Sequence, residues 1–267
     1  MNLQIFAVSD KGLIRKHNED MVLIGSEIFR DGTRQVTIDL TEREKKFFVA
    51  IADGMGGHNA GEIASELLLR KIAEKVKSLR SNLPENELAE KFSLWASEIH
   101  SFIIEEGNKD PNRKGMGSTL IGVLFYDRKA YYINAGDSRL YRFRDGLLKQ
   151  ISRDHSFREI LGKKDIPSNV IFNSFGGKSN GIFIDFEPVG GKILNGDILL
   201  LCSDGLSDMI SDDEIEETLT EDKNSINKLL EKAKSNGGKD NISIIPVSYT
   251  HLRAHETRHD LVCRLLL

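Results

Sequence analysis

Short apolar runs recur along this chain at close intervals, and this spacing limits the folds that are open to it. Several neighbouring runs are separated by only a turn, such as the Asp145-Gly146 pair. Two strands joined by so short a connection pair antiparallel, because a parallel pair needs a much longer crossover. The pattern therefore predicts antiparallel sheets rather than repeated βαβ units. The expected strands cover residues 3–8, 21–24, 34–40, 46–52, 118–126, 129–135, 140–144, 182–186, 197–202 and 242–247.

Two long segments with a helical period interrupt these strands. Residues 62–79 and residues 85–106 place apolar side chains three or four positions apart. Pro84 precedes the second segment and Gly107 follows it, where each residue type is tolerated. Two sheets with helices on their outer faces would bury this pattern, and no linker divides the chain, so we expect one α+β domain. Two shorter helices are expected at residues 212–219 and 223–234.

The composition is that of a globular protein. Hydrophobic residues make up 39% and charged residues 29% of the 267 positions, which excludes a disordered or collagen-like chain. The formal net charge of −4 offers no electrostatic surface for nucleic acid. The sequence has no apolar run long enough to cross a membrane and no signal-peptide pattern at its start. With only two cysteines, we expect a cytoplasmic protein that binds neither nucleic acid nor membrane.

The last residues differ in character from the rest of the chain. No hydrophobic period organises residues 247–267, and their back-translation resembles a transposase sequencing adapter followed by a flow-cell primer. We therefore expect residues 1–246 to form the domain and residues 247–267 to be a non-native tail; a natural basic tail is the alternative. On this view the spacing of His251, His255 and His259, which suits a metal-binding helix face, carries no meaning.

Aspartates recur at the ends of the apolar strands. Asp53, Asp137 and Asp204 each follow such a run, and Asp240 stands before the last one. A single aspartate there is more often a cap or a turn residue, but several converging carboxylates cannot all ionise without counter-charge. Hard divalent cations with oxygen ligands supply that charge. Because residues 1–246 lack the CxxC, HExxH and GxxxxGK[ST] patterns, zinc-protease and phosphate-loop sites have no support in this part of the chain.

Six motifs follow one another along the chain. They are SDKGLIRKHNED at 9–20, FFVAIADGMGGHNAGEIAS at 47–65, GMGSTL at 115–120, INAGDSRLYRFRDGLLKQISRDHS at 133–156, LLLCSDGLSDMI at 199–210 and GGKDNISII at 237–245. In this order they resemble the metal-dependent PP2C-type (PPM) protein serine/threonine phosphatase family, over residues 3–246. The resemblance implies an α-β-β-α sandwich of two antiparallel sheets flanked by helices. It also implies hydrolysis of phosphoserine and phosphothreonine in proteins.

The same resemblance implies two Mn²⁺ or Mg²⁺ ions and, as in bacterial members, a weaker third ion. Asp53 matches the carboxylate that bridges the first two ions, and Gly54 matches a residue that contributes its backbone carbonyl. Asp204 and Asp240 match ligands of the second ion. Two such ions would bridge one water and lower its pKa toward neutrality, so that hydroxide attacks phosphorus without a phosphoenzyme.

Four further residues complete the implied site. Glu19 and Asp20 match the acidic pair beside the second ion, and which of the two ligates it is left open. Asp137 matches a ligand of the third ion. Arg15 matches the arginine that grips the substrate phosphate, for which its planar fork is suited. The implied catalytic residues are Arg15, Asp53, Asp204 and Asp240.

The general acid is not assigned by the sequence. Some family members carry a histidine directly after the metal-binding Asp-Gly pair, where it could protonate the leaving alkoxide. This chain has Met55 at that position, with His17 and His58 elsewhere in the same motifs. A histidine in a loop is more often a bystander, and metal-bound water could supply the proton instead.

Two segments depart in length from the family pattern. The flap after Asp154, at residues 162–168, is short, which leaves substrate preference and third-ion behaviour open. The stretch between Asp20 and Phe47 is longer than a simple connection needs. Within it, residues 28–40 look like an added hairpin, which we interpret as an elaborated sheet edge.

These features predict a bacterial-type phosphatase, monomeric, that acts on phosphoproteins made by a serine/threonine kinase. A phosphatase of anti-sigma-factor antagonists shares the implied fold, but such proteins usually carry sensor or membrane regions. A pseudophosphatase would bind phosphoproteins without cleaving them, and the retention of Arg15, Asp53, Asp204 and Asp240 argues against it. A purely structural sandwich would have to bury ionised carboxylates without a cation, which is too costly.

Overall fold

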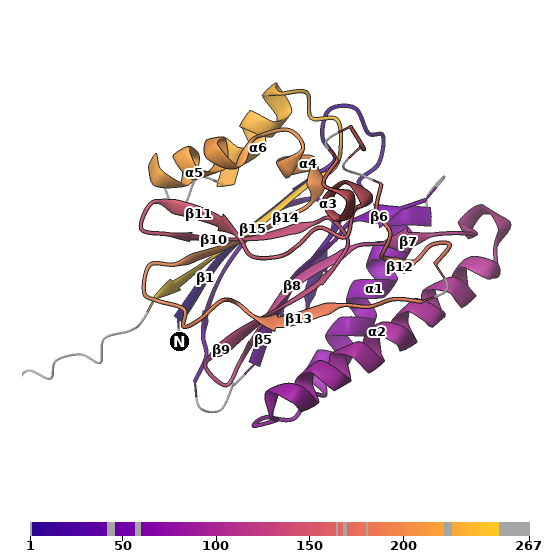
Figure 1. Ribbon diagram of the computed structural model, residues 1–267, viewed down its shortest axis with the longest axis horizontal. Coiled ribbons are helices and arrows are strands. Elements are labelled where there is room, and N and C mark those ends of the chain that lie inside the picture. Colours follow the sequence, from indigo (N-terminus) through magenta and orange to yellow (C-terminus); the bar gives the residue numbers. More distant parts are fainter. Residues whose placement is uncertain are drawn as a thin grey trace, which may run out of the picture.

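The structure is a computed structural model and describes residues 2–41, 46–56, 60–163, 165–167, 170–179, 181–221 and 226–250. Two six-stranded antiparallel sheets lie face to face, and helices cover the outer face of each sheet (Figure 1). A third, three-stranded sheet consists of two-residue strands only. The α-β-β-α sandwich expected from the sequence is confirmed.

The first sheet brings together strands from both ends of the chain. Its strands in spatial order are β11 (Leu147–Gln150), β10 (Arg139–Arg144), β14 (Ile198–Cys202), β15 (Ile242–Thr250), β1 (Asn2–Asp10) and β4 (Gly32–Asp39). The outer face is covered by α4 (Asp204–Ser207), α5 (Asp212–Glu221) and α6 (Ile226–Ser235). Leu206, Ile215 and Leu229 from these helices share one buried cluster with Leu200 and Ile244 of the sheet.

The second sheet carries the two long helices. Its strands in spatial order are β13 (Asp185–Pro188), β9 (Lys129–Ala135), β8 (Leu120–Tyr126), β5 (Lys46–Ala52), β2 (Met21–Ile24) and β3 (Glu27–Phe29). The helices are α1 (Ala60–Lys77) and α2 (Glu85–Asn108). Leu68 of α1 and Phe92 of α2 are buried in one cluster with Phe48 of β5.

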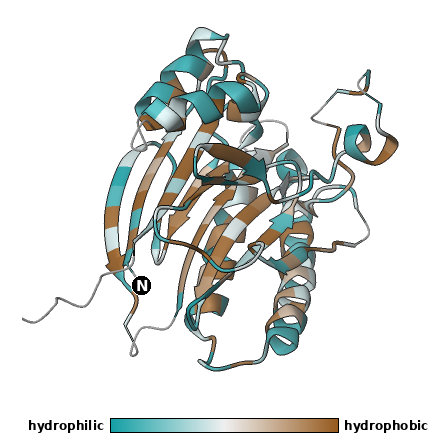
Figure 2. Ribbon diagram, turned by 60° about the vertical axis from the view of Figure 1, so that its left-hand side comes forward, coloured by the Kyte–Doolittle hydropathy of each residue, from teal (hydrophilic) through white to brown (hydrophobic). Residues whose placement is uncertain are grey.

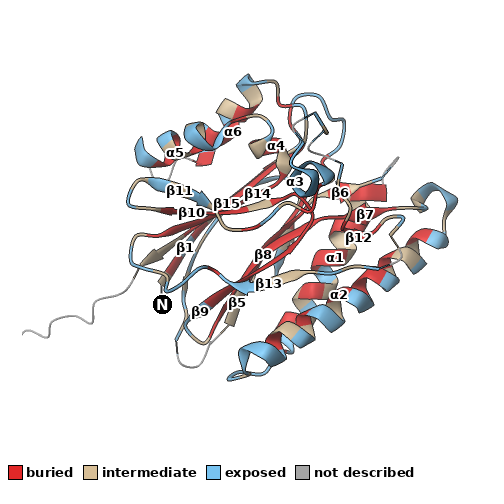
Figure 3. Cartoon of the chain, in the orientation of Figure 1, coloured by how far each residue is buried: buried red, intermediate tan, exposed pale blue. Residues whose placement is uncertain are grey.

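The space between the two sheets is filled by the opposite faces of the same strands. Ile5 and Leu201 of the first sheet share a buried cluster with Val49, Ile51 and Val123 of the second. Because side chains alternate between the two faces of a strand, the central strands are buried on both faces and read as continuous apolar runs. Figure 2 shows these strands as largely hydrophobic, and Figure 3 shows them as largely buried.

The small sheet and two short helices lie between the main elements. The small sheet consists of β6 (Gly54–Met55), β7 (Gly117–Ser118) and β12 (Phe175–Gly176), with β7 in the middle. The 3-10 helix η1 (Pro111–Arg113) follows α2, and α3 (Phe157–Leu161) follows β11. Ser156 caps α3, because its hydroxyl accepts the Glu159 N–H.

The expected hairpin at residues 28–40 is not one. β3 pairs with β2 in the second sheet, whereas β4 pairs with β1 in the first, so the chain crosses between the sheets near Gly32. None of the β4 residues is fully buried, as suits an edge strand. The free edge of β1 offers β4 a full ladder of hydrogen bonds, and covering an exposed edge is a reason for this pairing.

The last strand runs past the expected end of the domain. β15 continues to Thr250, and its residues after Pro246 pair with β1 up to the Asn2–Thr250 pair. The origin of residues 247–267 as a non-native tail stays a prediction. Residues 251–267, with the three histidines discounted above, lie outside the described residues.

The long helices were well predicted by their hydrophobic period. Against expected limits of 62–79 and 85–106, the structure has α1 at Ala60–Lys77 and α2 at Glu85–Asn108. The expected strand at 182–186 is shifted to β13. Among the helices that the structure describes, none has the length and the apolar composition needed to cross a bilayer.

Candidate active site

The strand order brings the acidic strand ends to one end of the sandwich. Ala52, the last residue of β5, pairs with Met21 at the start of β2. On the other sheet, Cys202 at the end of β14 pairs with Ile244 near the start of β15. Antiparallel pairing thus sets the end of one strand beside the start of the next. The residues at these positions, with the one that follows β9, are called the strand-end carboxylates below: Asp20, Asp53, Asp137, Asp204 and Asp240.

The strand-end carboxylates repel one another. Burial raises the pKa of Asp53 well above its usual range, and the charges of the other four raise it further. Burial likewise raises the pKa of Asp204, with Asp137 and Asp240 as its strongest charged neighbours. Burial is also the main reason why the pKa of Asp20 rises to about 6 and that of Asp137 to about 7. Such shifts mark a group of acids that lacks positive charge.

Two buried oxygens in this group have no hydrogen-bond donor among the described residues. They are Oδ1 of Asp20 and Oδ1 of Asp204. Leaving such an atom unsatisfied costs about 1–3 kcal/mol, and more for a charged group. In the described part of the chain, no three His, Cys, Asp or Glu side chains are already arranged as a cage for an ion. The carboxylate oxygens nevertheless make a donor set that fits hard cations chemically.

Asp53 is held through its backbone by the GMGSTL motif. Its N–H donates to Thr119 Oγ1 at 3.1 Å, and its carbonyl accepts the Thr119 N–H at 2.9 Å. The Ser118 hydroxyl donates to the same carbonyl at 3.0 Å. Thr119 Oγ1 also lies 2.9 Å from Ser138 Oγ. These bonds explain why the small hydroxyl residues Ser118 and Thr119 stand in this motif, because they fix the main chain that carries Asp53.

Gly54 lies where no side chain fits. A Cβ at this position would stand 2.2 Å from the Gly61 carbonyl oxygen and 2.6 Å from that of Glu19. A Cβ on Gly61 would in turn stand 2.8 Å from the Glu19 carboxyl carbon. The glycines therefore let β6, the start of α1 and the Glu19 segment pack in direct contact.

Asp20, Glu19 and Asp240 are connected by hydrogen bonds between three of the motifs. The Ser203 hydroxyl donates to Asp20 Oδ2 at 2.8 Å. The Glu19 N–H donates to Asn241 Oδ1 at 2.8 Å, and the Asn241 N–H donates to Asp240 Oδ1 at 2.8 Å. Burial raises the pKa of Glu19 to about 7, against the opposing charge of Arg15. The NED, SDG and DN motifs thus form one connected structure.

Arg15 faces the strand-end carboxylates from the surface. Its Nη2 donates to Asp240 Oδ2 at 2.6 Å, and 49% of its side chain is exposed. It lines an open groove of about 830 Å³ together with Lys16, Glu19, Ile63 and Arg113. A guanidinium at this place is the nearest positive charge to the carboxylates on the groove side.

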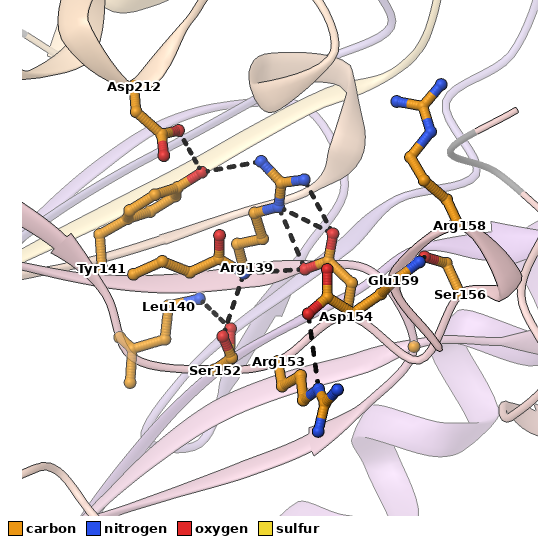
Figure 4. A network of polar contacts seen from close by, with 12 residues as sticks. Arg139, Leu140, Tyr141, Ser152, Arg153, Asp154, Ser156, Arg158, Glu159 and Asp212 are labelled. Carbon is orange, nitrogen blue, oxygen red and sulfur yellow. Dashed lines mark hydrogen bonds and ion pairs between the residues drawn. The ribbon is translucent and has the colours of Figure 1, made fainter. Parts of the chain in front are cut away.

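Arg139, two positions after Asp137, belongs to a network of polar contacts that extends to α5 (Figure 4). Arg139 donates from Nε and Nη2 to the Asp154 carboxylate, the shortest contact being 2.8 Å. Nη1 of Arg139 donates to the Tyr141 hydroxyl at 3.1 Å, and this hydroxyl donates to Asp212 Oδ1 at 2.9 Å. The GDSR motif is thereby held to the segment that follows β11 and to the start of α5.

The motifs did not single out two acidic residues of this neighbourhood. After burial, the charges of Asp154 and Asp208 are what raise the pKa of Asp137. Asp208 also raises the pKa of Asp204. It stands four positions after Asp204, so the helical spacing of the two acids was a signal for it in the sequence.

The histidines leave the general acid open. His17 is an exposed residue, and its Nδ1 lies 3.5 Å from Glu62 Oε1. His58 lies outside the described residues, and Met55 belongs to β6.

Several bacterial phosphatases are similar to this chain in sequence. It is 33% identical over 251 residues to the serine/threonine protein phosphatase PstP of Mycobacterium tuberculosis, which covers 91% of this chain and 44% of PstP. It is 30% identical over 252 residues to the serine/threonine phosphatase stp of Listeria innocua, with 90% of this chain and 93% of stp covered. The chain thus spans less than half the length of PstP.

Solved structures show the same fold. The serine/threonine phosphatase of S. agalactiae matches with a TM-score of 0.77 at 26% identity, over 93% of this chain and all of that one (100%). The catalytic domain of PstP, solved in complex with two manganese ions, matches with a TM-score of 0.70 at 31% identity, over 94% and 100% of the two chains. A sequence profile described as Protein phosphatase 2C matches residues 35–240. With the sandwich, the strand-end carboxylates and these matches in agreement, the chain belongs to the protein phosphatase 2C family.

Proposed function

We propose that this chain hydrolyses phosphoserine and phosphothreonine in proteins at a centre of two divalent cations. The observation that carries the proposal is the convergence of the five strand-end carboxylates, of which Asp20, Asp53, Asp137 and Asp204 have pKa values raised above their usual range, mainly by burial. Bound Mn²⁺ or Mg²⁺ ions would supply positive charge and a water of near-neutral pKa as nucleophile, so no phosphoenzyme is needed. The two manganese ions in the PstP catalytic domain support this choice of metal.

The residues that would hold the ions are assigned by their positions in the sequence motifs. Asp53 is surrounded by the other four carboxylates and is therefore assigned as the bridging ligand, with the Gly54 carbonyl beside it. Asp204 and Asp240 are assigned to the second ion, where the unpartnered Oδ1 of Asp204 offers a ready ligand atom. Asp137, which the charge of Asp208 also influences, is assigned to a weaker third ion.

Glu19 and Asp20 are placed differently around this centre. Glu19 lines the open groove, whereas Asp20 is buried and accepts a hydrogen bond from Ser203. Oδ1 of Asp20 remains unpartnered among the described residues. We assign both to the surroundings of the second ion and leave open which of them ligates it.

Arg15 would bind the phosphate of the substrate. In the structure its guanidinium donates a hydrogen bond to Asp240 and supplies the positive counter-charge for that carboxylate. Once Asp240 is neutralised by a cation, the planar fork of Arg15 can turn to two phosphate oxygens. Because half of its side chain is exposed in the groove, the arginine can reach a phosphate without rearrangement of the core.

The proposed substrates are phosphoproteins made by a serine/threonine kinase, and the proposed enzyme is a monomer. The groove beside Arg15 is open to solvent, which suits a segment of a protein rather than an enclosed small molecule. The names of the PstP and stp relatives support serine and threonine as the dephosphorylated residues.

The experiment that tests this function is phosphate release from a phosphothreonine peptide, with Mn²⁺ and with EDTA. Circular dichroism on the same samples reports whether the protein is folded. We expect turnover with Mn²⁺ and none with EDTA. Equal turnover in EDTA would contradict the metal centre. A folded protein that binds the peptide but releases no phosphate would instead be a phosphoprotein-binding pseudophosphatase.

A further inference from the structure

Arg30 lies where the chain crosses from one sheet to the other. It directly follows β3 of the second sheet, and β4 of the first sheet begins two residues later at Gly32. This is the segment that looked like an added hairpin in the sequence. The Arg30 side chain is only 19% exposed. Arg30 is not among the residues proposed above to bind the substrate or the ions.

The guanidinium of Arg30 binds the main chain on both sides of Glu19. Nη1 donates to the Asn18 carbonyl at 2.7 Å and to the Asp20 carbonyl at 3.3 Å. The contact is reciprocal, because the Asn18 side-chain amide donates to the Arg30 carbonyl at 2.7 Å and to Asp31 Oδ1 at 3.0 Å. The NED motif and the crossing segment are thus locked to each other.

The same guanidinium also binds the first turn of α1. Nη2 donates to the Glu62 carbonyl at 2.8 Å. This turn contains Gly61, which packs against the Glu19 carboxyl, and α1 further contributes Ser65, whose hydroxyl donates to the Glu19 carbonyl at 2.6 Å. A single side chain therefore binds both the NED motif, which contains Glu19, and the first turn of α1, which packs against the Glu19 side chain.

We propose that Arg30 is a positioning residue that holds Glu19 and Asp20 toward the other strand-end carboxylates. It acts through three backbone carbonyls and touches neither the substrate nor an ion. The planar fork is what lets one side chain serve carbonyls on two segments, and a lysine at this place could not reproduce it. The crossing segment, which the phosphatase reaction itself does not explain, would thereby support the metal centre. This inference rests on the proposed two-cation site.

The test is Mn²⁺ binding by isothermal titration calorimetry without substrate. Arg30→Met is compared with the wild type and with Arg34→Met. Arg34 is a matched control from the same segment, because it bonds Glu27 at 2.6 Å and stacks on Phe29, away from the NED motif. Partners that orient metal ligands typically contribute about 10- to 100-fold in affinity, so we expect a loss of that size for Arg30→Met. We expect no measurable loss for Arg34→Met.

A merely structural role would lower the unfolding temperature of Arg30→Met but leave the Mn²⁺ affinity of the folded protein unchanged, and that result would overturn the inference. If Arg30→Met does not fold, the Mn²⁺ affinity of Arg30→Lys is measured in its place. If neither variant folds, Arg30 is required for folding and the positioning role is refuted. A wild type that binds no Mn²⁺ overturns this inference together with the metal centre. A wild type that binds Mn²⁺ but releases no phosphate overturns only the proposed hydrolysis.

Discussion

β14 has an aspartate near each of its ends, and the two acids meet opposite surroundings. Asp197, directly before the strand, is buried and accepts hydrogen bonds from Arg144 Nε at 2.7 Å and Nη2 at 2.6 Å. It also accepts the Leu194 N–H at 2.7 Å. Asp204, two residues after the strand, has a buried Oδ1 without a donor among the described residues, and its neighbours are other carboxylates.

The difference is visible in the pKa values of the two groups. Burial would raise the pKa of Asp197, but the hydrogen bonds from Arg144 and Leu194, together with the charges of Arg144 and Arg142, outweigh it, and the pKa is lowered. Burial raises the pKa of Asp204, and Asp137 and Asp240 raise it further. An acid that is paired with arginine stabilises the native state, whereas acids gathered without counter-charge are poised to bind cations. The two ends of one strand thus separate an acid in a structural ion pair from one that we propose as a metal ligand.

The largest expected effect is the loss of turnover when the functional acid is neutralised. Asp204→Asn removes a proposed ligand of the second ion, and the charge stabilisation that ions supply is worth several kcal/mol. We expect kcat/KM to fall by at least about 10³-fold. Asp53→Asn should behave in the same way. Phosphate release with Mn²⁺ measures both, and circular dichroism checks that the fold survives.

Asp197→Asn is the matched control for this prediction. It makes the same chemical change at the other end of β14, so its activity below the unfolding temperature should stay near that of the wild type. Near-normal turnover in Asp53→Asn and Asp204→Asn would remove the basis of the site assignment.

The second effect concerns the free energy of unfolding, which we expect Asp197→Asn to lower more than Asp204→Asn does. Asp197→Asn leaves Arg144 without its carboxylate, and breaking a buried ion pair costs about 3–5 kcal/mol. Because 28% of the Arg144 side chain is exposed, we expect a smaller loss of about 2 kcal/mol in the free energy of unfolding. Asp204→Asn should lose no stability in metal-free protein, since it relieves repulsion. Urea unfolding in EDTA measures both variants, and equal losses would contradict the comparison.

The third effect is a pH dependence of the metal-free protein. Asp20 and Asp137 have folded-state pKa values of about 6 and about 7, above those of the unfolded chain. The folded state therefore binds more protons between about pH 4 and pH 7, and the free energy of unfolding falls as the pH rises through this range. We expect a fall of several kcal/mol in EDTA, because each unit of pKa shift is worth about 1.4 kcal/mol.

Saturating Mn²⁺ should remove this fall, because the ions provide the missing counter-charge. Asp197 changes the free energy of unfolding in the opposite direction. Because its pKa is lowered in the folded state, it stabilises that state at neutral pH, and this contribution is lost only as the pH falls toward the lowered pKa. Urea titrations across this pH range, with EDTA and with Mn²⁺, measure the effect. A stability that is flat or rises in EDTA would show that the strand-end carboxylates do not repel one another.

The smallest expected effect is that of Arg15→Lys in the metal-loaded protein. Lysine keeps the charge beside Asp240 but loses the bidentate fork, so phosphate binding should weaken while the metal centre remains. We expect KM for a phosphothreonine peptide to rise about tenfold, or about 1.4 kcal/mol, with a smaller change in kcat. Steady-state kinetics separate the two constants, and Lys16→Met, on the same groove, is the control. An unchanged KM would take Arg15 out of phosphate binding.

Local patterns were sufficient wherever one physical rule controlled the outcome. The helical period placed α1 and α2 within two residues of their observed limits, because their apolar faces pack on a sheet. The turn at Asp145-Gly146 was predicted from residue type, and both residues adopt positive φ angles, of 52° and 82°. The strand-end aspartates were likewise visible as acids after apolar runs.

The same local patterns did not predict which strand β4 pairs with. The segment with Asp31 and Gly32 has the pattern of a hairpin, but β4 pairs with the edge of β1 and not with β3. Alternating exposure along β4 is the same for either partner, so the residues themselves do not decide between them. Arg30 could not be linked to the NED motif for the same reason, since that contact exists only after the crossing.

The chain on its own therefore predicted the fold class and the family correctly and provided the candidate acids of the site, because each depends on residue types at short spacing. Which acids lack a counter-charge was decided by packing. Asp197 and Asp204 both stand next to the apolar run of β14, and nothing local tells them apart. Arg144 reaches Asp197 from the neighbouring strand β10, whereas Asp204 faces carboxylates from other strand ends. Charge acts through space, so the role of each acid depends on which distant residues the fold places beside it.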